Sequence, residues 1–379
     1  PHLRPGGEPG GRGEGRLAAR GRAGAEELLD LLLGAVGFLL FHARRDWRLE
    51  EKKPLVFTGR AKRLFAVAAV PGVAMVLMAL SPALTPPPSS VSFALGSIYA
   101  LVILHTAPLL LGLANLVLKP VQRSINRGFE RSAERKLKQI DPLIFGVSGS
   151  YGKTTTKFCL GAVLGADRPT LFTPESYNSL LGVTRTVNEF LEPQHEAFIV
   201  ELGAYRVGDI KEICDLVHPK IGVLCSIGPV HLERFGSIDE ILRAESEVLD
   251  SLPEDGHFVT NGDDEECLKA AARSHVPVSL FSLKDPSATA YAGEVSLSDG
   301  RAEFDMHLAG EVHRVSSPLL GSHNVANMLA TAAAAHAAGM QPAAIAAALA
   351  HAEGPPHRLQ PIYNREAGVL VIDDAYNSN

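Results

Sequence analysis

The chain has 379 residues and a formal net charge of −6. This length suits about two or three domains, and the acidic balance excludes nucleic-acid binding through bulk positive charge, so we expect no nucleic-acid partner. The cysteines have no paired spacing, which argues against a disulfide framework or a cysteine-based zinc site and suits a reducing compartment. They are Cys159, Cys214, Cys225 and Cys267.

The first part of the chain predicts a membrane region. Residues 1–25 are rich in Gly and Arg and poor in large apolar side chains, so we expect them to be disordered. Residues 26–118 contain two or three predicted membrane helices. Leu64–Leu84 and Val91–Leu118 are each long enough to cross a bilayer of about 30 Å, which disfavours buried core helices. Leu28–Phe41 is shorter and contains an Asp, so whether it spans is left open.

The distribution of basic residues predicts the orientation. Residues 42–63 carry eight Lys and Arg, and seven more lie between Lys119 and Lys138, whereas the link 81–90 carries no charge. By the positive-inside rule the basic segments lie on the cytoplasmic side of the inner or plasma membrane, with everything after them. Residues 119–140 are predicted to form a basic juxtamembrane helix, and a plain solvated helix is the alternative.

The segment 144–156, IFGVSGSYGKTTT, carries the strongest chemical signal. The apolar run Leu143–Val147 predicts a strand, and a helical pattern follows the glycine-rich turn through Leu164. Such a turn aims backbone N–H groups and a helix N-terminus at one anion, and Gly-Lys-Thr makes it a nucleoside-triphosphate site. Val147 replaces the first glycine of the general P-loop pattern. The predicted phosphate-binding residues are Gly149, Ser150, Gly152, Lys153, Thr154 and Thr155.

Strand and helix patterns alternate after this loop, which predicts an α/β fold with a mostly parallel sheet of the P-loop ATPase type. The predicted strands are Leu143–Val147, Ala197–Leu202, Ile221–Ile227, His257–Asn261 and Val278–Leu283. The predicted helices include Val207–Leu216, Ile238–Leu252, Asn324–Ala338 and Pro342–His351. Two alternating runs within 290–316 predict a small antiparallel hairpin. Residues 141–354 therefore form the predicted ATP-binding domain.

Several polar residues stand where a metal or base site is expected. Glu201 ends an apolar strand, and a carboxylate there, beside a phosphate loop, is well placed for Mg²⁺. His231 follows another strand end as a further metal-ligand candidate, although a loop His is more often a surface residue. Glu245 lies within a helical pattern and taken alone is an ordinary solvated Glu. Asn324 and Asn327 either read a base or cap a helix.

Together these segments resemble the Mur ligases, the ATP-dependent amide-forming enzymes of peptidoglycan synthesis. The resemblance covers Leu143–Asn379 and is strongest in its ordered motifs. These are GVSGSYGKTTT, ELGAYRVGDI, GPVHLERFGS, GSHNVANMLAT, HRLQPI and VIDDAYNSN. The forms ELGA, HLERFGS and DDAYN are most similar to the MurF type, which adds D-alanyl-D-alanine to a UDP-linked muramoyl tripeptide.

The resemblance implies a role for each matching residue, with ATP and Mg²⁺ as cofactors. Lys153 and the loop amides would bind the β- and γ-phosphates, with Thr154 on Mg²⁺, while Arg358 would contact the γ-phosphate. Glu201 and His231 would hold a second Mg²⁺. Asn324 and Asn327 would face the adenine, and Asp374 would contact the ribose. Asn178 and Ser179 match part of the family's substrate-side loop, although they replace a longer run of asparagines there. The implied catalytic residues are Lys153, His231, Glu245 and Arg358.

Two departures from the family pattern leave alternatives open. Most members have a Lys at the place of Glu245, which becomes carbamylated to ligate metal; either Glu245 supplies that negative charge directly, or the site is degenerate. The family's amino-terminal UDP-binding domain has no counterpart, and predicted membrane helices stand there instead. The substrate is therefore either UDP-linked and held differently, or lipid-linked and reached along the membrane.

The expected function is a membrane-anchored ligase that joins a muramoyl peptide to D-Ala-D-Ala or a similar amine through an acyl phosphate. Alternatives are the same chemistry on a lipid-linked muropeptide or a poly-γ-glutamate-like polymer, and a non-catalytic membrane scaffold that binds nucleotide. The chain begins at Pro1 and stops at Asn379 after a strand-like run, so we expect a fragment. Residues 355–379 would begin a truncated carboxyl-terminal ligase domain, and the fragment would turn over little. The patterns do not predict an oligomeric state.

Overall fold

The computed structural model describes residues 58–80, 90–298, 300–358, 360–364 and 368–375. The chain divides into two compact units, Pro1–Ser124 and Ile125–Asn379. The predicted disorder of residues 1–25, the apolar stretch Leu28–Phe41 and most of the uncharged link 81–90 lie outside the described residues. Each unit is described by itself below.

The first unit contains helix α2 (Gly59–Leu80) and most of helix α3 (Ser90–Ile140). Arg63 donates a hydrogen bond of 2.8 Å from α2 to Gln122 of α3. Over the residues that the structure describes, neither helix meets the length and apolarity needed to cross a bilayer. The predicted transmembrane spans are therefore not confirmed. Residues 119–140 are helical, as predicted.

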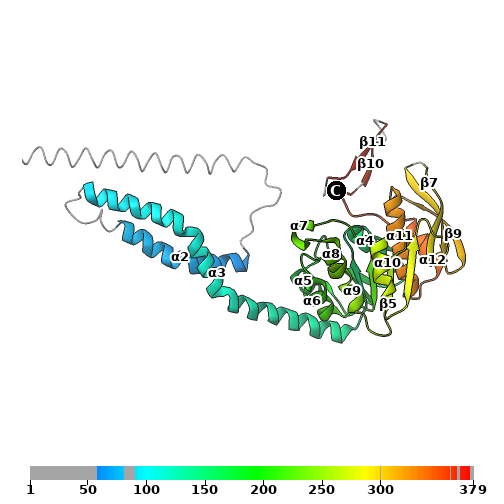
Figure 1. Cartoon of the computed structure of the whole chain (residues 1–379), viewed down its shortest axis with the longest axis horizontal. Coiled ribbons are helices and arrows are strands. Elements are labelled where there is room, and N and C mark those ends of the chain that lie inside the picture. Colours follow the sequence, from blue (N-terminus) through cyan, green and yellow to red (C-terminus); the bar gives the residue numbers. More distant parts are fainter. Residues whose placement is uncertain (1–57, 81–89, 299, 359, 365–367, 376–379) are drawn as a thin grey trace, which may run out of the picture. The chain divides into compact units, whose positions relative to one another are not determined.

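The second unit is built on one nine-stranded sheet in the order β2-β3-β1-β4-β5-β6-β7-β8-β9 (Figure 1). The first seven strands in this order pair in parallel. Their bounds are β2 (Thr170–Phe172), β3 (Ala197–Glu201), β1 (Leu143–Ser148), β4 (Ile221–Leu224), β5 (His257–Asn261), β6 (Val278–Ser282) and β7 (Ala290–Ser298). The predicted mostly parallel α/β sheet is confirmed.

The antiparallel part extends the same sheet instead of standing apart from it. Strand β7 pairs with β8 (Arg301–Leu308), and β8 pairs with β9 (Glu311–Ser317), both antiparallel. The predicted hairpin is therefore present, and a third strand follows it. A separate antiparallel pair, β10 (Gln360–Asn364) and β11 (Val369–Asp373), lies near the end of the chain.

Helices cover both faces of the sheet, as Figure 1 shows. One core lies under α4 (Lys153–Gly165), α11 (Ser322–Ala337) and α12 (Pro342–Leu349). The other core lies under five helices and the end of α3. These five are α5 (Leu180–Phe190), α6 (Asp209–Val217), α8 (Ile238–Glu245), α9 (Glu247–Asp250) and α10 (Glu265–Ala272). A parallel sheet covered on both faces explains why its strands are continuous apolar runs.

Strand β1 shows how the sequence sets this arrangement. Phe145 and Val147 belong to the first core, whereas Ile144, which precedes them on the opposite face of the strand, belongs to the second. A Cβ at Gly146 would lie 3.0 Å from the Leu202 side chain, so a glycine allows the second core to pack closely against this strand. The last residues of β1 lead directly into the glycine-rich loop.

Some element predictions are wrong in detail. The predicted helix Ile238–Leu252 is two helices, α8 and α9, that separate at Ser246. The Ser246 hydroxyl donates a hydrogen bond of 2.5 Å to the Leu242 carbonyl oxygen, which competes with the regular helical pattern. The structure also adds elements that the patterns do not predict, namely β2, α5, α10 and the short helix α7 (Leu232–Phe235).

Candidate nucleotide-binding and active site

The glycine-rich loop between β1 and α4 requires its glycines. Gly149 has φ 127° and Gly152 has φ 86°, both in the region that favours glycine. A Cβ at Gly149 would lie 3.0 Å from the Ser226 backbone, and one at Gly152 would lie 2.5 Å from Asn327 Oδ1. The Ser150 N–H donates 2.7 Å to the Ser226 carbonyl oxygen. The loop is therefore fixed between the segment after β4 and helix α11.

The amino end of α4 faces a cavity of about 960 Å³. Gly152 occupies the N-cap position and supplies no side-chain cap, so the first N–H groups of the helix have no side-chain acceptor there. Every residue that the sequence predicts for phosphate binding except Gly149 lines this cavity. The geometry is that of an anion site at a helix N-terminus.

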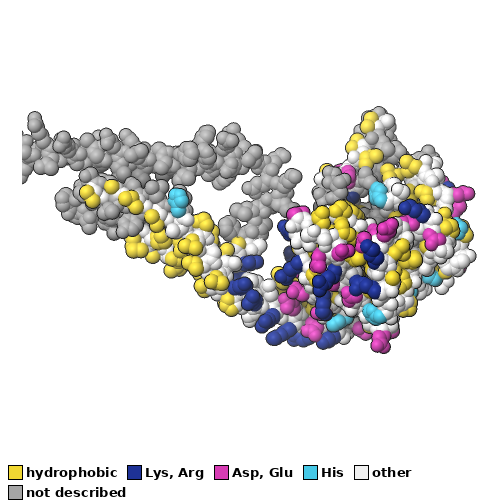
Figure 2. All heavy atoms as spheres, viewed as in Figure 1, with side chains coloured by type: hydrophobic (Ala, Val, Ile, Leu, Met, Phe, Trp, Pro, Cys, Tyr) yellow, Lys and Arg dark blue, Asp and Glu magenta, His cyan; other side chains and the backbone are white. Residues whose placement is uncertain are grey.

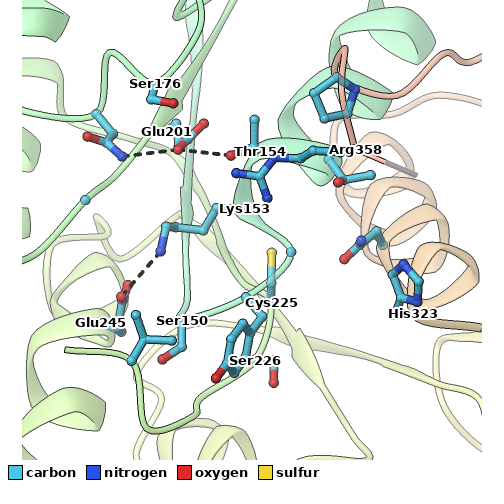
Figure 3. Close-up of a pocket in the computed structure, with 18 of the residues that line it drawn as sticks. Ser150, Lys153, Thr154, Ser176, Glu201, Cys225, Ser226, Glu245, His323 and Arg358 are labelled. Atoms are coloured by element: carbon cyan, nitrogen blue, oxygen red, sulfur yellow. Dashed lines mark hydrogen bonds and ion pairs between the residues drawn. The ribbon is translucent and has the colours of Figure 1, made fainter. Parts of the chain in front are cut away.

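Lys153 points into the cavity and faces Glu245 across it (Figure 3). Its Nζ lies 3.6 Å from Glu245 Oε1 and also donates to the Gly149 carbonyl oxygen. Glu245 Oε2 accepts a hydrogen bond of 2.7 Å from the Gly149 N–H, and its side chain is 6% exposed. Glu245 ends α8 and is not an ordinary solvated Glu, because its carboxylate is buried and accepts a hydrogen bond from the loop.

Glu201 is the second carboxylate of the site and is almost completely buried. Its Oε1 accepts hydrogen bonds from Thr154 Oγ1 at 3.3 Å and from Asn178 Nδ2 at 3.2 Å. Figure 3 shows the hydrogen bond between Thr154 and Glu201. Its Oε2 accepts no hydrogen bond, and its partner is the ammonium of Lys157, an ion pair at 2.9 Å. The structure therefore brings Thr154, Asn178 and Glu201 together at the end of β3.

The oxygen atoms of Thr154 and Glu201 fit Mg²⁺, which prefers carboxylate and hydroxyl oxygens. Glu201 Oε1, which lies 3.3 Å from Thr154 Oγ1, is the oxygen available to such an ion, because Oε2 is paired with the Lys157 ammonium. His231 lines the same cavity, but its ring packs against Tyr205 with 5.3 Å between centroids. Within the described ranges, no three His, Cys, Asp or Glu side chains cluster closely enough to hold a metal ion. A second metal held by Glu201, His231 and Glu245 stays a prediction.

The two asparagines predicted for the adenine side lie in the first turns of α11 and line the cavity. Asn327 Nδ2 donates 3.2 Å to Asn324 Oδ1, and Asn324 Nδ2 donates 2.7 Å to the Leu320 carbonyl oxygen. Thr156 Oγ1 donates 3.4 Å to Asn327 Oδ1. Asn327 therefore connects α4 to α11, and both asparagines line the cavity beside the predicted phosphate site.

Arg358 and Asp374 also line the cavity, although both lie far along the chain. Figure 3 shows the Arg358 side chain directed into the cavity that holds Lys153 and Thr154. Burial lowers the pKa of His323, and the charge of Asp374 opposes this shift, so these two residues lie near each other at the cavity wall. The structure thus gathers the predicted hinge residues beside the loop. Ser179 instead caps α5, where its side chain accepts from the Gly182 N–H.

Several cavity or near-cavity residues are missing from the sequence predictions, among them the polar residues Tyr151, Lys157, Ser226 and His323. Lys157 carries the clearest sequence signal, because a lone Lys stands among the apolar and Thr positions of α4 that face the sheet. The other three occupy loop or helix-start positions whose neighbours in space come from distant parts of the sequence. Periodicity alone gives no sign of such contacts.

Comparison with known proteins identifies the fold unit. The family model described as the Mur ligase middle domain matches residues 147–335. The chain contains a Mur ligase middle domain. The match begins within β1 and ends within α11, so it includes the nucleotide loop, Glu201, His231, Glu245 and both asparagines.

The relatives of this Mur ligase domain are of the MurF type. The UDP-N-acetylmuramoyl-tripeptide–D-alanyl-D-alanine ligase of Mycobacterium tuberculosis is 35% identical over 240 residues, which cover 62% of this chain and 46% of that protein. The ligase of the same name from Escherichia coli is 31% identical over 278 residues, which cover 73% of this chain and 60% of that protein. The chain thus spans about half the length of the curated relatives it matches.

Solved structures agree with this assignment. MurF from Acinetobacter baumannii superposes with a TM-score of 0.62 at 31% identity, covering 67% of this chain and 55% of that one. MurF from Thermotoga maritima, solved in complex with ADP, gives a TM-score of 0.62 at 25% identity, covering 67% and 58%. The predicted resemblance to the Mur ligases, and within them to the MurF type, is confirmed for the region these matches cover.

Proposed function

We propose that this chain supplies the ATP-binding part of a ligase that joins D-alanyl-D-alanine, or a similar amine, to a muramoyl tripeptide. One observation carries the proposal. The nucleotide loop presents Lys153 and Thr154 to a cavity that also contains two buried carboxylates, Glu201 and Glu245. The MurF-type relatives support the choice of substrates, because their names state both the muramoyl tripeptide and the D-alanyl-D-alanine.

The proposed chemistry has two steps. The peptide carboxylate attacks the γ-phosphorus of ATP, which forms an acyl phosphate and releases ADP. The amine then attacks the acyl carbon, and the tetrahedral intermediate collapses to the amide and phosphate. Neither step needs a nucleophile from the protein, so the residues position reactants and neutralise charge.

The residues of the cavity suit those tasks. The N–H groups at the start of α4 and the Lys153 ammonium would bind the terminal phosphates. Arg358 enters from the opposite part of the wall and would add positive charge at the transferring phosphoryl group. Asn324 and Asn327 would face the adenine. The site contains Lys and Arg where negative charge accumulates, as phosphoryl transfer requires.

Thr154 and Glu201 would hold Mg²⁺. When bound, this ion would neutralise phosphate charge and help to orient the γ-phosphate. We further propose that Glu245 supplies the negative charge that a carbamylated lysine supplies in most Mur ligases, with His231 as an additional ligand. The support is that Glu245 is already a buried carboxylate at the loop, so no modification is required to make it negative.

We also propose a location at the inner or plasma membrane, with the ATP-binding domain in the cytoplasm. Exposed apolar side chains lie on α2 and on the uncharged part of α3, including Phe65, Val70, Leu77, Leu109 and Leu116. Figure 2 shows apolar side chains along α3 followed by Lys and Arg. Cosedimentation with anionic phospholipid vesicles tests this location; equal recovery with and without vesicles would contradict it.

The ligase proposal is tested in the full natural protein by substrate omission. Phosphate release from ATP should require both UDP-muramoyl tripeptide and D-alanyl-D-alanine, and the product should be the pentapeptide. A parallel reaction with a lipid-linked muropeptide distinguishes the two forms of the carboxylate substrate. Nucleotide binding without any amide product would favour a scaffold and would count against the ligase.

A further inference from the structure

Lys157 is a buried cation that the proposed chemistry does not use. It lies one helical turn after Lys153 on α4, and its side chain is 0% exposed. Burial lowers the pKa of Lys157, and the charge of Glu201 opposes that shift. A buried ammonium costs free energy unless it is paired, and even a paired one is often no more stable than an apolar replacement. A role beyond stability is therefore worth seeking in what Lys157 contacts.

Lys157 makes two contacts on different segments. Its Nζ lies 2.9 Å from Glu201 Oε2, at the end of β3. It also donates a hydrogen bond of 2.5 Å to the Glu175 carbonyl oxygen. Glu175 belongs to residues 173–179, which we call the substrate-side loop. One side chain on the nucleotide-loop helix therefore holds both the carboxylate of the proposed metal site and the backbone of this loop.

Two further contacts connect the substrate-side loop to Glu201, one to its carboxylate and one to its backbone N–H. Asn178 Nδ2 donates to Glu201 Oε1, and the Glu201 N–H donates 3.1 Å to Thr173 Oγ1. The Gly203 N–H donates 2.9 Å to the Asn178 carbonyl oxygen, just beyond β3. Both ends of the loop are thus attached to the end of β3, and the middle is attached to Lys157.

The middle of the loop has an unusual backbone. Glu175 has φ 43°, a left-handed conformation that side-chain-bearing residues rarely adopt. Such a conformation persists where surrounding contacts hold it, and these residues cluster at functional sites. The Lys157 ammonium on the Glu175 carbonyl is such a contact. The loop is therefore held in its conformation by the helix that begins at the phosphate site.

We propose that Lys157 is a positioning residue that couples occupancy of the nucleotide loop to the conformation of the substrate-side loop. The inference rests on the proposed nucleotide binding at Lys153 and Thr154. Glu201 is shared between Thr154 on the nucleotide side and Asn178 on the loop side. A ligand that breaks the hydrogen bond from Thr154 to Glu201 changes the position of the Glu201 carboxylate. Lys157, which contacts both Glu201 and Glu175, transmits that change to the loop. Nucleotide binding then orders the loop that carries Asn178.

Amide hydrogen exchange on this chain tests the coupling without a ligase assay. Saturating Mg-ATP should slow exchange of the peptide covering residues 173–179 by about fivefold in the wild type. In Lys157→Met the same peptide should show no nucleotide-dependent slowing at a Mg-ATP concentration that again saturates the protein. Lys157→Arg, which keeps the positive charge, should retain part of the nucleotide-dependent slowing. The matched control is Lys269→Met, which removes an exposed Lys paired with Glu266 at 2.6 Å on α10.

The nucleotide-dependent difference separates coupling from a merely structural role, because general loosening raises exchange equally with and without ligand. Slowing in Lys157→Met as large as in the wild type would overturn the inference. If Lys157→Met does not fold, Lys157→Gln carries the same test, because it keeps a hydrogen-bond donor at this position but removes the charge that pairs with Glu201. Calorimetry on the wild type keeps the two proposals distinct. No Mg-ATP binding refutes the proposed function and this inference together, whereas binding without loop slowing refutes only the inference.

Discussion

Lys153 and Glu245 form an ion pair across the nucleotide loop, with 3.6 Å between Nζ and Oε1. The other carboxylate oxygen accepts from the Gly149 N–H. The Glu245 carboxylate thus contacts two groups that belong to the proposed phosphate site, the Lys153 ammonium and the Gly149 N–H. An incoming triphosphate competes with it for Lys153, and a divalent cation offers the carboxylate a new partner. The two proposed roles of Glu245, on the loop and on the metal, are consistent with each other.

Glu245→Gln should therefore separate binding from turnover. With EDTA present, ATP should bind the variant about tenfold more tightly, because Lys153 loses its competing charge. In the full natural protein the same change should abolish most ATP turnover, because the negative charge at the metal is lost. Calorimetry and phosphate release measure the two effects. Unchanged turnover would refute the metal role of Glu245, and Glu265→Gln, an exposed Glu on α10, is the control.

Lys153→Met should weaken Mg-ATP binding by about 10- to 100-fold, since hydrogen bonds to charged groups contribute about 1.5–3 kcal/mol. Titration calorimetry on this chain measures the dissociation constant. Lys269→Met, the same change on an exposed helix, should leave it unchanged. Equal affinities for the two variants would place the nucleotide elsewhere in the molecule.

Gly152→Ala should destabilise the protein by about 1–3 kcal/mol and impair ATP binding. The alanine would have to adopt φ 86°, and its Cβ would lie 2.5 Å from Asn327 Oδ1. Gly165→Ala on the same helix is the control, because nothing lies within 4 Å of its Cβ position. Chemical denaturation compares the two variants. A Gly152→Ala protein as stable as Gly165→Ala would show that the loop does not hold this conformation in solution.

All four thiols should be unreactive in the folded protein. The cysteines are buried, and burial raises the pKa of Cys159, Cys214 and Cys225 to about 12 and also raises that of Cys267. At pH 8 a thiol with such a pKa is ionised in about one molecule in ten thousand, so an aromatic disulfide reagent reacts slowly. Denaturant should release four reactive thiols. Rapid modification of Cys225 in the native state would indicate that the cavity wall opens.

Much of the fold could be predicted from the sequence because a parallel sheet covered on both faces leaves a strong pattern. The five predicted strands all exist, and the central ones, β1, β3 and β4, are mainly apolar runs. The strand β2 has only three residues, too few for any periodicity, and is recognised only by its pairing with β3. The hairpin was predictable from its alternation, whereas its parallel attachment to β6 across the link 283–289 leaves no periodic signal in the sequence.

The site was predictable where a local motif carries the chemistry and not where chemistry depends on distance. Lys153 and Thr154 follow from the loop pattern, and Glu201 follows from its place at a strand end. The pairing of Glu245 with Gly149 joins residues far apart in the chain, so no local pattern predicts it. Lys157 is similar, because its position among apolar and Thr residues marks it as unusual, but its partner Glu201 is distant in the sequence and no local pattern predicts the pairing.

The most direct test of the central proposal is phosphate release by the full natural protein with ATP, Mg²⁺, UDP-muramoyl tripeptide and D-alanyl-D-alanine. We predict release only when both the peptide and the amine are present, in a one-to-one ratio with the amide product. We also predict its loss in Lys153→Met. Release that continues without the amine or the peptide, or that survives Lys153→Met, would contradict the account.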